Sequence, residues 1–200
     1  MAEAIEIRVL TGADPALREF VPDLARLRIE VFRAFPYLYD GTLEYETKYL
    51  QTYLDCRESV VVLALDGACV VGAATAMPLA QETEEFQAPF RRAGIDPAKV
   101  FYCGESVLLP AYRGRGIYRH FLAERERHAR ALGRFDRITM CGVVRPPDHP
   151  RRPADYVPLD EVWAHFGYQP RPDLIASFEW KDLDEPTSTA KPMVFREKLL

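Results

Sequence analysis

Two glycines and three arginines lie within seven consecutive residues, 113–119, which read Arg-Gly-Arg-Gly-Ile-Tyr-Arg. Gly114 and Gly116 would let the backbone approach a ligand closely and adopt positive φ angles. Successive backbone N–H groups in such a turn form a concave site for anions, and the arginine side chains add positive charge around it. This combination of residue types predicts a binding site for a phosphate or pyrophosphate group.

The elements on either side of this turn should position it. β-forming residues run from 100 to 109, and Pro110 should end that strand because it has no N–H to donate. Apolar residues then recur at helical spacing as far as Leu132, and Gly133 is suited to the helix C-terminus. The first N–H groups of a helix lack partners within it, so a helix starting at the turn favours an anion. The alternative is a basic turn that only caps a helix.

Two common phosphate-binding loops do not fit this turn. A Walker A loop requires Lys followed by Ser or Thr after its last glycine, and neither pair occurs here. A dinucleotide fingerprint requires a third glycine, but its position, counted from Gly114, is held by Arg119.

The turn resembles the acyl-CoA motif of the GNAT superfamily of N-acetyltransferases, Gln/Arg-x-x-Gly-x-Gly/Ala after a strand. Tyr118 stands here in place of the final small residue. The resemblance implies acetyl-CoA as co-substrate, with its pyrophosphate held by Arg113, Gly114, Arg115, Gly116, Ile117, Tyr118 and Arg119. It also implies that the preceding strand splays from its neighbour, so that the backbone of Ser106, Val107 and Leu108 binds the pantetheine arm.

Hydrophobic periodicity and turn residues predict one mixed α/β domain over residues 1–200. Strands are expected at 4–10, 59–65, 69–77, 100–109, 137–144, 174–180 and 191–200. Helices are expected at 15–32, with a break at Pro22, from a Thr42 cap to 53, at 117–132 and at 160–166, plus a helical insertion at about 78–99. The resemblance implies a mostly antiparallel central sheet with a splayed strand pair and helices on both faces. Residues 28–40, the insertion and the Pro-rich loop 145–153 resemble an uncharacterised bacterial branch of the superfamily.

Composition narrows the class of protein. The formal net charge is −4, whereas a general nucleic-acid binder would show a strong basic excess. The sequence has no N-terminal apolar segment of a signal peptide and no apolar run of membrane-spanning length, so we expect a cytoplasmic protein without a membrane partner. The cysteines, at 56, 69, 103 and 141, lack metal-site or C-x-x-C spacing, which is typical of reduced thiols.

The resemblance implies direct attack of a primary amine, from a small molecule or a protein, on the thioester in a ternary complex. Many family members carry a tyrosine in the late helix as the acid for the leaving thiolate. Trp163 occupies that position here, and an indole donates a hydrogen bond but no proton. Tyr156 is therefore a candidate acid. The alternatives are a thiolate that leaves unaided, or loss of catalysis.

Glu105, just before the turn, is the candidate base for the amine proton. The alternative is a glutamate simply paired with an arginine of a neighbouring helix. His149, beside Asp148 in the Pro-rich loop, is a further candidate that would line the acceptor pocket. The superfamily resemblance implies that Tyr37, Tyr39 and Asp40 form a wall of the acceptor cleft, with an aromatic plug under a turn as the alternative.

Two functional hypotheses follow. The first is an acetyl-CoA-dependent N-acetyltransferase, for which the superfamily suggests a homodimer. The second, favoured by Trp163, is a non-catalytic acyl-CoA-binding or sensing module on the same fold. A phosphate-binding protein unrelated to coenzyme A would need the turn without the splayed strand.

Overall fold

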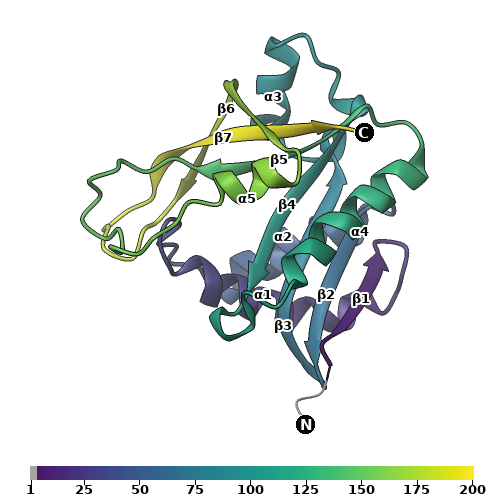
Figure 1. The fold of residues 1–200 in the computed structure, drawn as a ribbon, viewed down its shortest axis with the longest axis horizontal. Helices are drawn as coiled ribbons and strands as arrows, with labels where there is room; N and C mark the ends of the chain where they lie inside the picture. Colours follow the sequence, from purple (N-terminus) through teal and green to yellow (C-terminus); the bar gives the residue numbers. More distant parts are fainter. Residues whose placement is uncertain (1–3) are drawn as a thin grey trace.

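The computed structural model describes residues 4–200 as a seven-stranded sheet with helices on both faces (Figure 1). The strand order is β1-β2-β3-β4-β5-β7-β6, and every neighbouring pair is antiparallel except β4 and β5. The strands are β1 Glu6–Thr11, β2 Val60–Asp66, β3 Cys69–Pro78, β4 Val100–Leu108, β5 Arg137–Val143, β6 Gln169–Trp180 and β7 Thr189–Leu199. The helices are α1 Leu17–Phe32, α2 Leu43–Asp55, α3 Glu84–Arg92, α4 Ile117–Leu132 and α5 Asp160–His165. The predicted mixed, mostly antiparallel sheet is confirmed.

The β2–β3 hairpin lies inside the sheet, between β1 and β4. β2 is buried on both faces, as its run of β-branched residues predicts. Its turn follows from Asp66-Gly67, where Asp66 pairs with Cys69 and Gly67 adopts a φ of 57°. In β3, a Cβ atom on Gly72 would lie 2.5 Å from Cδ1 of Leu108, so the glycine permits close packing of β4.

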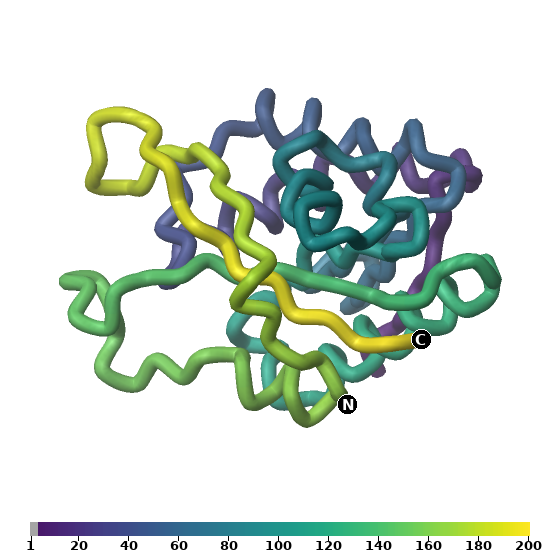
Figure 2. The backbone as a smooth tube through the Cα atoms, turned by 90° about the horizontal axis from the view of Figure 1, so that it is seen from above, coloured from purple at the N-terminus to yellow at the C-terminus, as the bar shows by residue number. Residues whose placement is uncertain are grey.

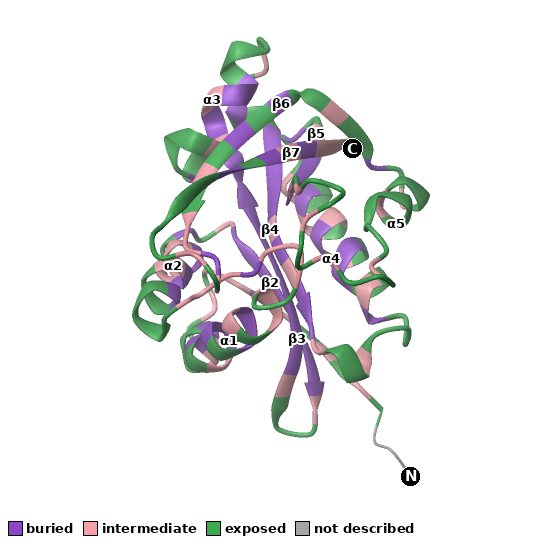
Figure 3. Cartoon of the chain, turned by 90° about the vertical axis from the view of Figure 1, so that its left-hand side faces the viewer, coloured by how far each residue is buried: buried purple, intermediate pink, exposed green. Residues whose placement is uncertain are grey.

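Two helical layers cover the sheet and give it two cores (Figures 1 and 3). Alternate residues of β2 point to opposite faces. Val60 and Val62 pack with Phe121 of α4, whereas Val61 and Leu63 pack with the helices α1 and α2. The strands between these layers are the most buried part of the molecule (Figure 3).

Helix ends follow local sequence signals. The Thr42 hydroxyl accepts a hydrogen bond of 3.3 Å from the backbone N–H of Tyr45, which confirms the predicted cap of α2. Gly116 and Gly133 flank α4 with φ angles of 79° and 69°. The predicted break at Pro22 is wrong, because α1 runs through it. Near the helix start, that proline removes only one hydrogen bond.

The C-terminal hairpin differs from the prediction at its first strand. β6 begins at Gln169 rather than at 174, with a register shift between Arg171 and Ile175. Pro170 and Pro172 made this segment read as a loop, but β6 is the edge strand, where prolines are tolerated. The segment just after β6 lies against the α1–α2 loop (Figure 2), where Tyr39 bridges to Asp182.

The segment between β3 and β4 contains the expected short helix, α3. It packs against β6 and β7 through a third apolar cluster that includes Phe90, Leu174 and Phe195. Within residues 4–200, no helix combines the length and the apolar character needed to span a bilayer.

Candidate active site

Strands β4 and β5 separate halfway along their length. Their parallel pairing extends only from Val100 and Arg137 to Cys103 and Met140. Beyond Cys103, β4 continues beside β3 while β5 continues beside β7. The edge of β4 that faces β5 is therefore left without a strand partner over residues 104–108, which confirms the predicted splayed pair (Figure 1).

A β-bulge marks the point of separation. Ala76 pairs with Cys103 but Ala74 pairs with Ser106, so β4 carries an extra residue opposite Thr75. Gly104 lies in this bulge, and any side chain there would collide with the hydroxyl group of Tyr53. The bulge thus turns β4 away from β5 at a position where only glycine fits.

Arg125 of α4 holds the bulge from the face covered by that helix. Its buried guanidinium donates to the carbonyl oxygens of Thr75 and Glu105 at 3.3 and 3.0 Å and to Oγ of Ser106 at 2.9 Å. Burial lowers the pKa of Arg125, but neighbours, Cys103 foremost, outweigh burial and raise the pKa. Sequence reasoning missed this residue. The available signal was an arginine four residues after Phe121 on the apolar face of the helix.

The glycine turn, residues 113–119, lies at the end of β4 and leads into α4. Gly114 and Gly116 have φ angles of 74° and 79°, and space is open around both. Arg113, Arg115 and Arg119 are exposed there. The structure thus brings the residues predicted to bind the cofactor together, with the unpartnered N–H groups of α4 beside the unpaired edge of β4.

A hydrogen bond joins the first turn of α4 to α5. Nε1 of Trp163 donates to the hydroxyl oxygen of Tyr118 at 2.7 Å. The Trp163 ring lies over Gly142 of β5, where a Cβ atom would be 3.0 Å from Cη2. Since Gly142 is two residues beyond the last β4–β5 pair, this bond lies beside the separated strands on the α4 face.

The opposite face, under α1 and α2, holds a buried carboxylate cluster made of Arg28, Glu46, Glu82 and Glu105. Nη1 of Arg28 lies 2.5 Å from Oε2 of Glu105, and Nε of the same arginine bonds Glu46. Glu105 therefore pairs with an arginine of a neighbouring helix, as one of the two sequence hypotheses expected. Glu46 and Glu105 thus share one buried guanidinium, and Glu82 is buried near them.

Glu82 was missed from the sequence because it lies in the segment interpreted as a helical insertion. Burial above all raises the pKa of Glu82 to about 7, and the charge of Glu105 adds to this rise. Oε1 of Glu46 and Oε1 of Glu82 make no hydrogen bond within residues 4–200. The carboxyl group of Glu82 can therefore hold a proton near neutral pH.

The α1–α2 loop carries the predicted acceptor wall and is fixed to the β6–β7 hairpin. The carbonyl oxygen of Tyr37 accepts from Arg145 at 2.8 Å and from Trp180 at 3.0 Å. Asp40 pairs with Lys181 at 2.7 Å, and this bond lowers the pKa of Asp40. Burial raises the pKa of Tyr39, and the charge of Glu46 adds to the rise, so this loop lies beside the buried carboxylate cluster.

His149, in the Pro-rich loop, and Tyr156, three residues after that loop, both pack against Phe35. Their ring centroids lie 5.6 and 4.7 Å from the Phe35 ring, and the guanidinium of Arg152 lies 4.9 Å from the Tyr156 ring. Burial raises the pKa of Tyr156. His149, predicted to line the acceptor pocket, and Tyr156, predicted as the acid, thus both lie beside the loop that follows α1.

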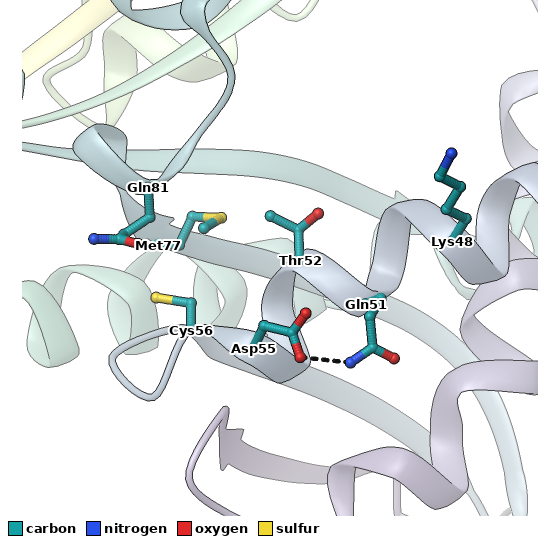
Figure 4. A pocket seen from close by; sticks show the side chains of 7 residues that line it. All are labelled: Lys48, Gln51, Thr52, Asp55, Cys56, Met77 and Gln81. Atoms are coloured by element: carbon teal, nitrogen blue, oxygen red, sulfur yellow. Dashed lines mark hydrogen bonds between the residues drawn. The ribbon is translucent and has the colours of Figure 1, made fainter.

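A surface pocket of about 380 Å³ lies beside the C-terminal half of α2 (Figure 4). Its lining residues are Lys48, Gln51, Thr52, Asp55, Cys56, Met77 and Gln81. None of the residues predicted for the cofactor or acceptor site contributes to this lining, so we do not assign the pocket to the site.

Solved structures share this fold at low sequence identity. The ribosomal-protein-alanine N-acetyltransferase from Brucella melitensis is 16% identical, with a TM-score of 0.61 over 98% of this chain and 99% of that one. NAA60 from Arabidopsis thaliana, in complex with a bisubstrate analogue, is 13% identical, with a TM-score of 0.60 over 98% of this chain and 99% of that one. yncA from Salmonella typhimurium, with its cofactor acetyl-CoA, is 11% identical, with a TM-score of 0.58 over 99% of this chain and 95% of that one. These identities show the fold alone.

The sequence comparisons complete the assignment. A search of curated protein sequences finds no match. Residues 24–153, more than half of the chain, match the family described as "Acetyltransferase (GNAT) family". This range includes the separated strand β4, the glycine turn and the helix α4. The chain therefore belongs to the GNAT family of acetyltransferases.

Proposed function

We propose that the protein transfers the acetyl group of acetyl-CoA to a primary amine of a small molecule or a protein. The observation that carries this proposal is the separation of β4 from β5 at a bulge that adjoins the glycine turn. Together they offer an unpaired strand edge and an anion site in one continuous surface. A pantetheine arm that ends in a pyrophosphate has this combination of amide groups and charge.

The cofactor would lie along both elements. The pyrophosphate would accept hydrogen bonds from backbone N–H groups of residues 114–118, with Arg113, Arg115 and Arg119 adding charge. The amides of the pantetheine arm would pair with the backbone of Ser106, Val107 and Leu108. The thioester would then lie near the bulge, to which the buried guanidinium of Arg125 donates.

The acceptor amine would approach from the face that holds the buried carboxylate cluster. A primary amine is cationic at neutral pH and must lose a proton before it attacks. Glu105 would take this proton, and Glu82, whose pKa of about 7 suits the task, would share it. Tyr37, Tyr39, Asp40 and His149 would line the approach to that cluster. The neutral amine then attacks the thioester directly in a ternary complex.

Calorimetric titration of acetyl-CoA into the wild type and Gly116→Glu tests the cofactor site. The new carboxylate would face the pyrophosphate, and like charges cost several kcal/mol, so binding should weaken by more than about 100-fold. Gly133→Glu is the matched control, because Gly133 has a similar φ of 69° and open space at the other end of α4. It should bind acetyl-CoA like the wild type. No binding to the wild type would refute the proposal.

The sensing alternative has one observation in its favour, the indole at position 163 in place of the family's usual phenol. Release of thiol from acetyl-CoA with a panel of primary amines separates the two. Binding without release under any condition would favour the sensor. Release that depends on an amine would favour the transferase.

A further inference from the structure

The tyrosine at position 118 is not explained by the acyl-CoA motif. The position corresponds to the small last residue of the acyl-CoA motif, yet the structure turns a phenol there toward α5. The ring is half-buried and packs against the apolar core beneath α4. Through Trp163, whose ring lies over Gly142 of β5, its hydroxyl group is held beside the separated strands on the α4 face.

The hydrogen bond to Trp163 fixes which atom of this pair can give a proton. The indole N–H is the donor at 2.7 Å, so the Tyr118 oxygen is the acceptor and its own proton is not used in this bond. Within residues 4–200, the structure shows no second hydrogen bond of this hydroxyl. An indole does not release its proton at physiological pH, whereas a phenol is an accepted general acid.

We propose that Tyr118 is the general acid that protonates the leaving thiolate of coenzyme A, and that Trp163 is a positioning residue that orients its hydroxyl. The inference rests on the proposed acetyl transfer. The amine nitrogen bonds the carbonyl carbon, the carbon–sulfur bond breaks with its electron pair on sulfur, and sulfur takes the phenolic proton. The amide nitrogen gives its second proton to solvent, and the phenolate recovers a proton from solvent. The glutamates then release the first amine proton, so one proton is released for each ammonium group that is acetylated.

The surroundings of Tyr118 suit this step. Arg125, on the same helix, is buried, charged and bonded to the bulge of β4. Arg196 of β7 lies with its guanidinium 4.5 Å from the Trp163 ring. Burial above all raises the pKa of Tyr37, and Cys141, Tyr118 and Tyr156 add to this rise. Tyr118 therefore lies within electrostatic reach of the α1–α2 loop. Both cations favour negative charge on the sulfur or the phenol while the proton moves.

Tyr156, the acid predicted from the sequence, has different surroundings. Its ring packs edge-on against Phe35 and beneath the guanidinium of Arg152, in the Pro-rich loop. Tyr118, in contrast, belongs to the glycine turn itself, and its hydroxyl has a fixed hydrogen-bond partner. The two candidate acids therefore predict opposite results for Tyr118→Phe and Tyr156→Phe, because only the variant that lacks the acid should lose activity.

Tyr118→Phe, Tyr156→Phe and Trp163→Phe are compared with Tyr168→Phe as the matched control. Tyr168 is a buried tyrosine whose hydroxyl donates to Glu126 at 3.3 Å, so its loss removes a phenol of structural role only. Thiol release from acetyl-CoA is measured between pH 6 and 10 with the best amine of a panel. Hydroxylamine is used if no amine is accepted, because so small a nucleophile needs no fitted pocket.

Tyr118→Phe should lower kcat by about 100-fold, the lower end of general-acid effects, because a thiolate is a good leaving group. Acetyl-CoA affinity by calorimetry should stay within about threefold, and the decline of kcat at alkaline pH should disappear. Trp163→Phe should lower kcat by about tenfold and keep that decline, because the acid remains but is less well oriented. Tyr168→Phe should match the wild type in both kcat and pH profile.

Four outcomes would decide against the inference. Unchanged kcat and pH profile in Tyr118→Phe would overturn it and leave acetyl transfer intact. A weaker affinity with unchanged kcat would make Tyr118 a cofactor contact only. A loss of kcat in Tyr156→Phe alone would identify Tyr156 as the acid, as predicted from the sequence. Wild type that binds acetyl-CoA without accelerating thiol release would overturn the inference but not the cofactor site, whereas absent binding would refute the proposed function itself.

Discussion

The glycine turn and the buried carboxylate cluster differ in how the chain builds them. The turn is a continuous stretch, residues 113–119, whose backbone does the binding and whose arginines are exposed. The buried carboxylate cluster takes one side chain each from α1, α2, the segment before α3, and β4. All four of these side chains are buried and charged or titratable. A local motif can therefore be changed at little cost to the fold, whereas the cluster cannot.

The physical reason lies in solvation. Exposed arginines keep their water, so the free energy of unfolding depends little on them. Buried charges lose their water, and their mutual attraction must replace it. Binding and stability are thus separable at the glycine turn and coupled in the buried carboxylate cluster. Three variants, taken from the largest expected effect to the smallest, test this difference.

Arg28→Met should be the most damaging change. It leaves Glu46 and Glu105 buried without their cation, and removing one partner of a buried pair typically costs about 3–5 kcal/mol. Chemical denaturation measures this loss as a lower midpoint with an unchanged slope. Arg26→Met is the control on the same helix, because Arg26 is exposed and pairs only with Asp23 one turn away. A loss below about 1 kcal/mol in Arg28→Met, the size of an exposed pair, would remove the contrast.

Glu82→Gln should give an intermediate effect that depends on pH. The folded-state pKa of Glu82 is about 7, above its ordinary value of 4.5, so its contribution to stability is complete below about pH 4.5 and is lost as pH rises through 7. The variant removes this loss. Its free energy of unfolding relative to wild type should therefore rise between pH 5 and 8, by at most about 3 kcal/mol, since each pKa unit corresponds to about 1.4 kcal/mol.

Glu85→Gln is the control for this titration. Glu85 belongs to the same segment, but a hydrogen bond from Thr83 lowers the pKa of its exposed carboxyl group. Its difference from wild type should stay flat over the same pH range. A flat difference for Glu82→Gln as well would mean that Glu82 is ionised throughout and that the cluster holds no proton near neutrality.

The same contrast explains what the sequence could predict. The hairpin at Asp66-Gly67, the Thr42 cap and the glycine turn are each specified by a few adjacent residues, and the structure contains all three. The separation of β4 from β5 was predicted from the resemblance of the glycine turn to the acyl-CoA motif. Strand and helix order was recoverable because hydrophobic periodicity is local too.

Long-range assembly was not recoverable in this way. Glu82 follows β3 in sequence and acquires its raised pKa only when α1, α2 and β4 enclose it. Arg125 reads as one charge on an amphipathic helix, yet it bonds two strands. Trp163 was noted as the wrong residue for an acid, but its partner Tyr118 is 45 residues away in the chain. Such pairings depend on packing, which no spacing rule encodes.

Arg115→Ala should have the smallest effect on the fold and a clear effect on binding. Arg115 is exposed, and its guanidinium lies 5.0 Å from the Tyr112 ring, so the free energy of unfolding should change by less than about 0.5 kcal/mol. Acetyl-CoA affinity should fall by about three- to tenfold at low salt and by less at high salt, because an exposed charge is screened. Titration calorimetry at two salt concentrations measures the affinity, and chemical denaturation measures the free energy of unfolding. Arg92→Ala on α3 is an exposed control that should change neither quantity. Destabilisation by more than about 1 kcal/mol would show that the turn, like the buried carboxylate cluster, couples binding to folding.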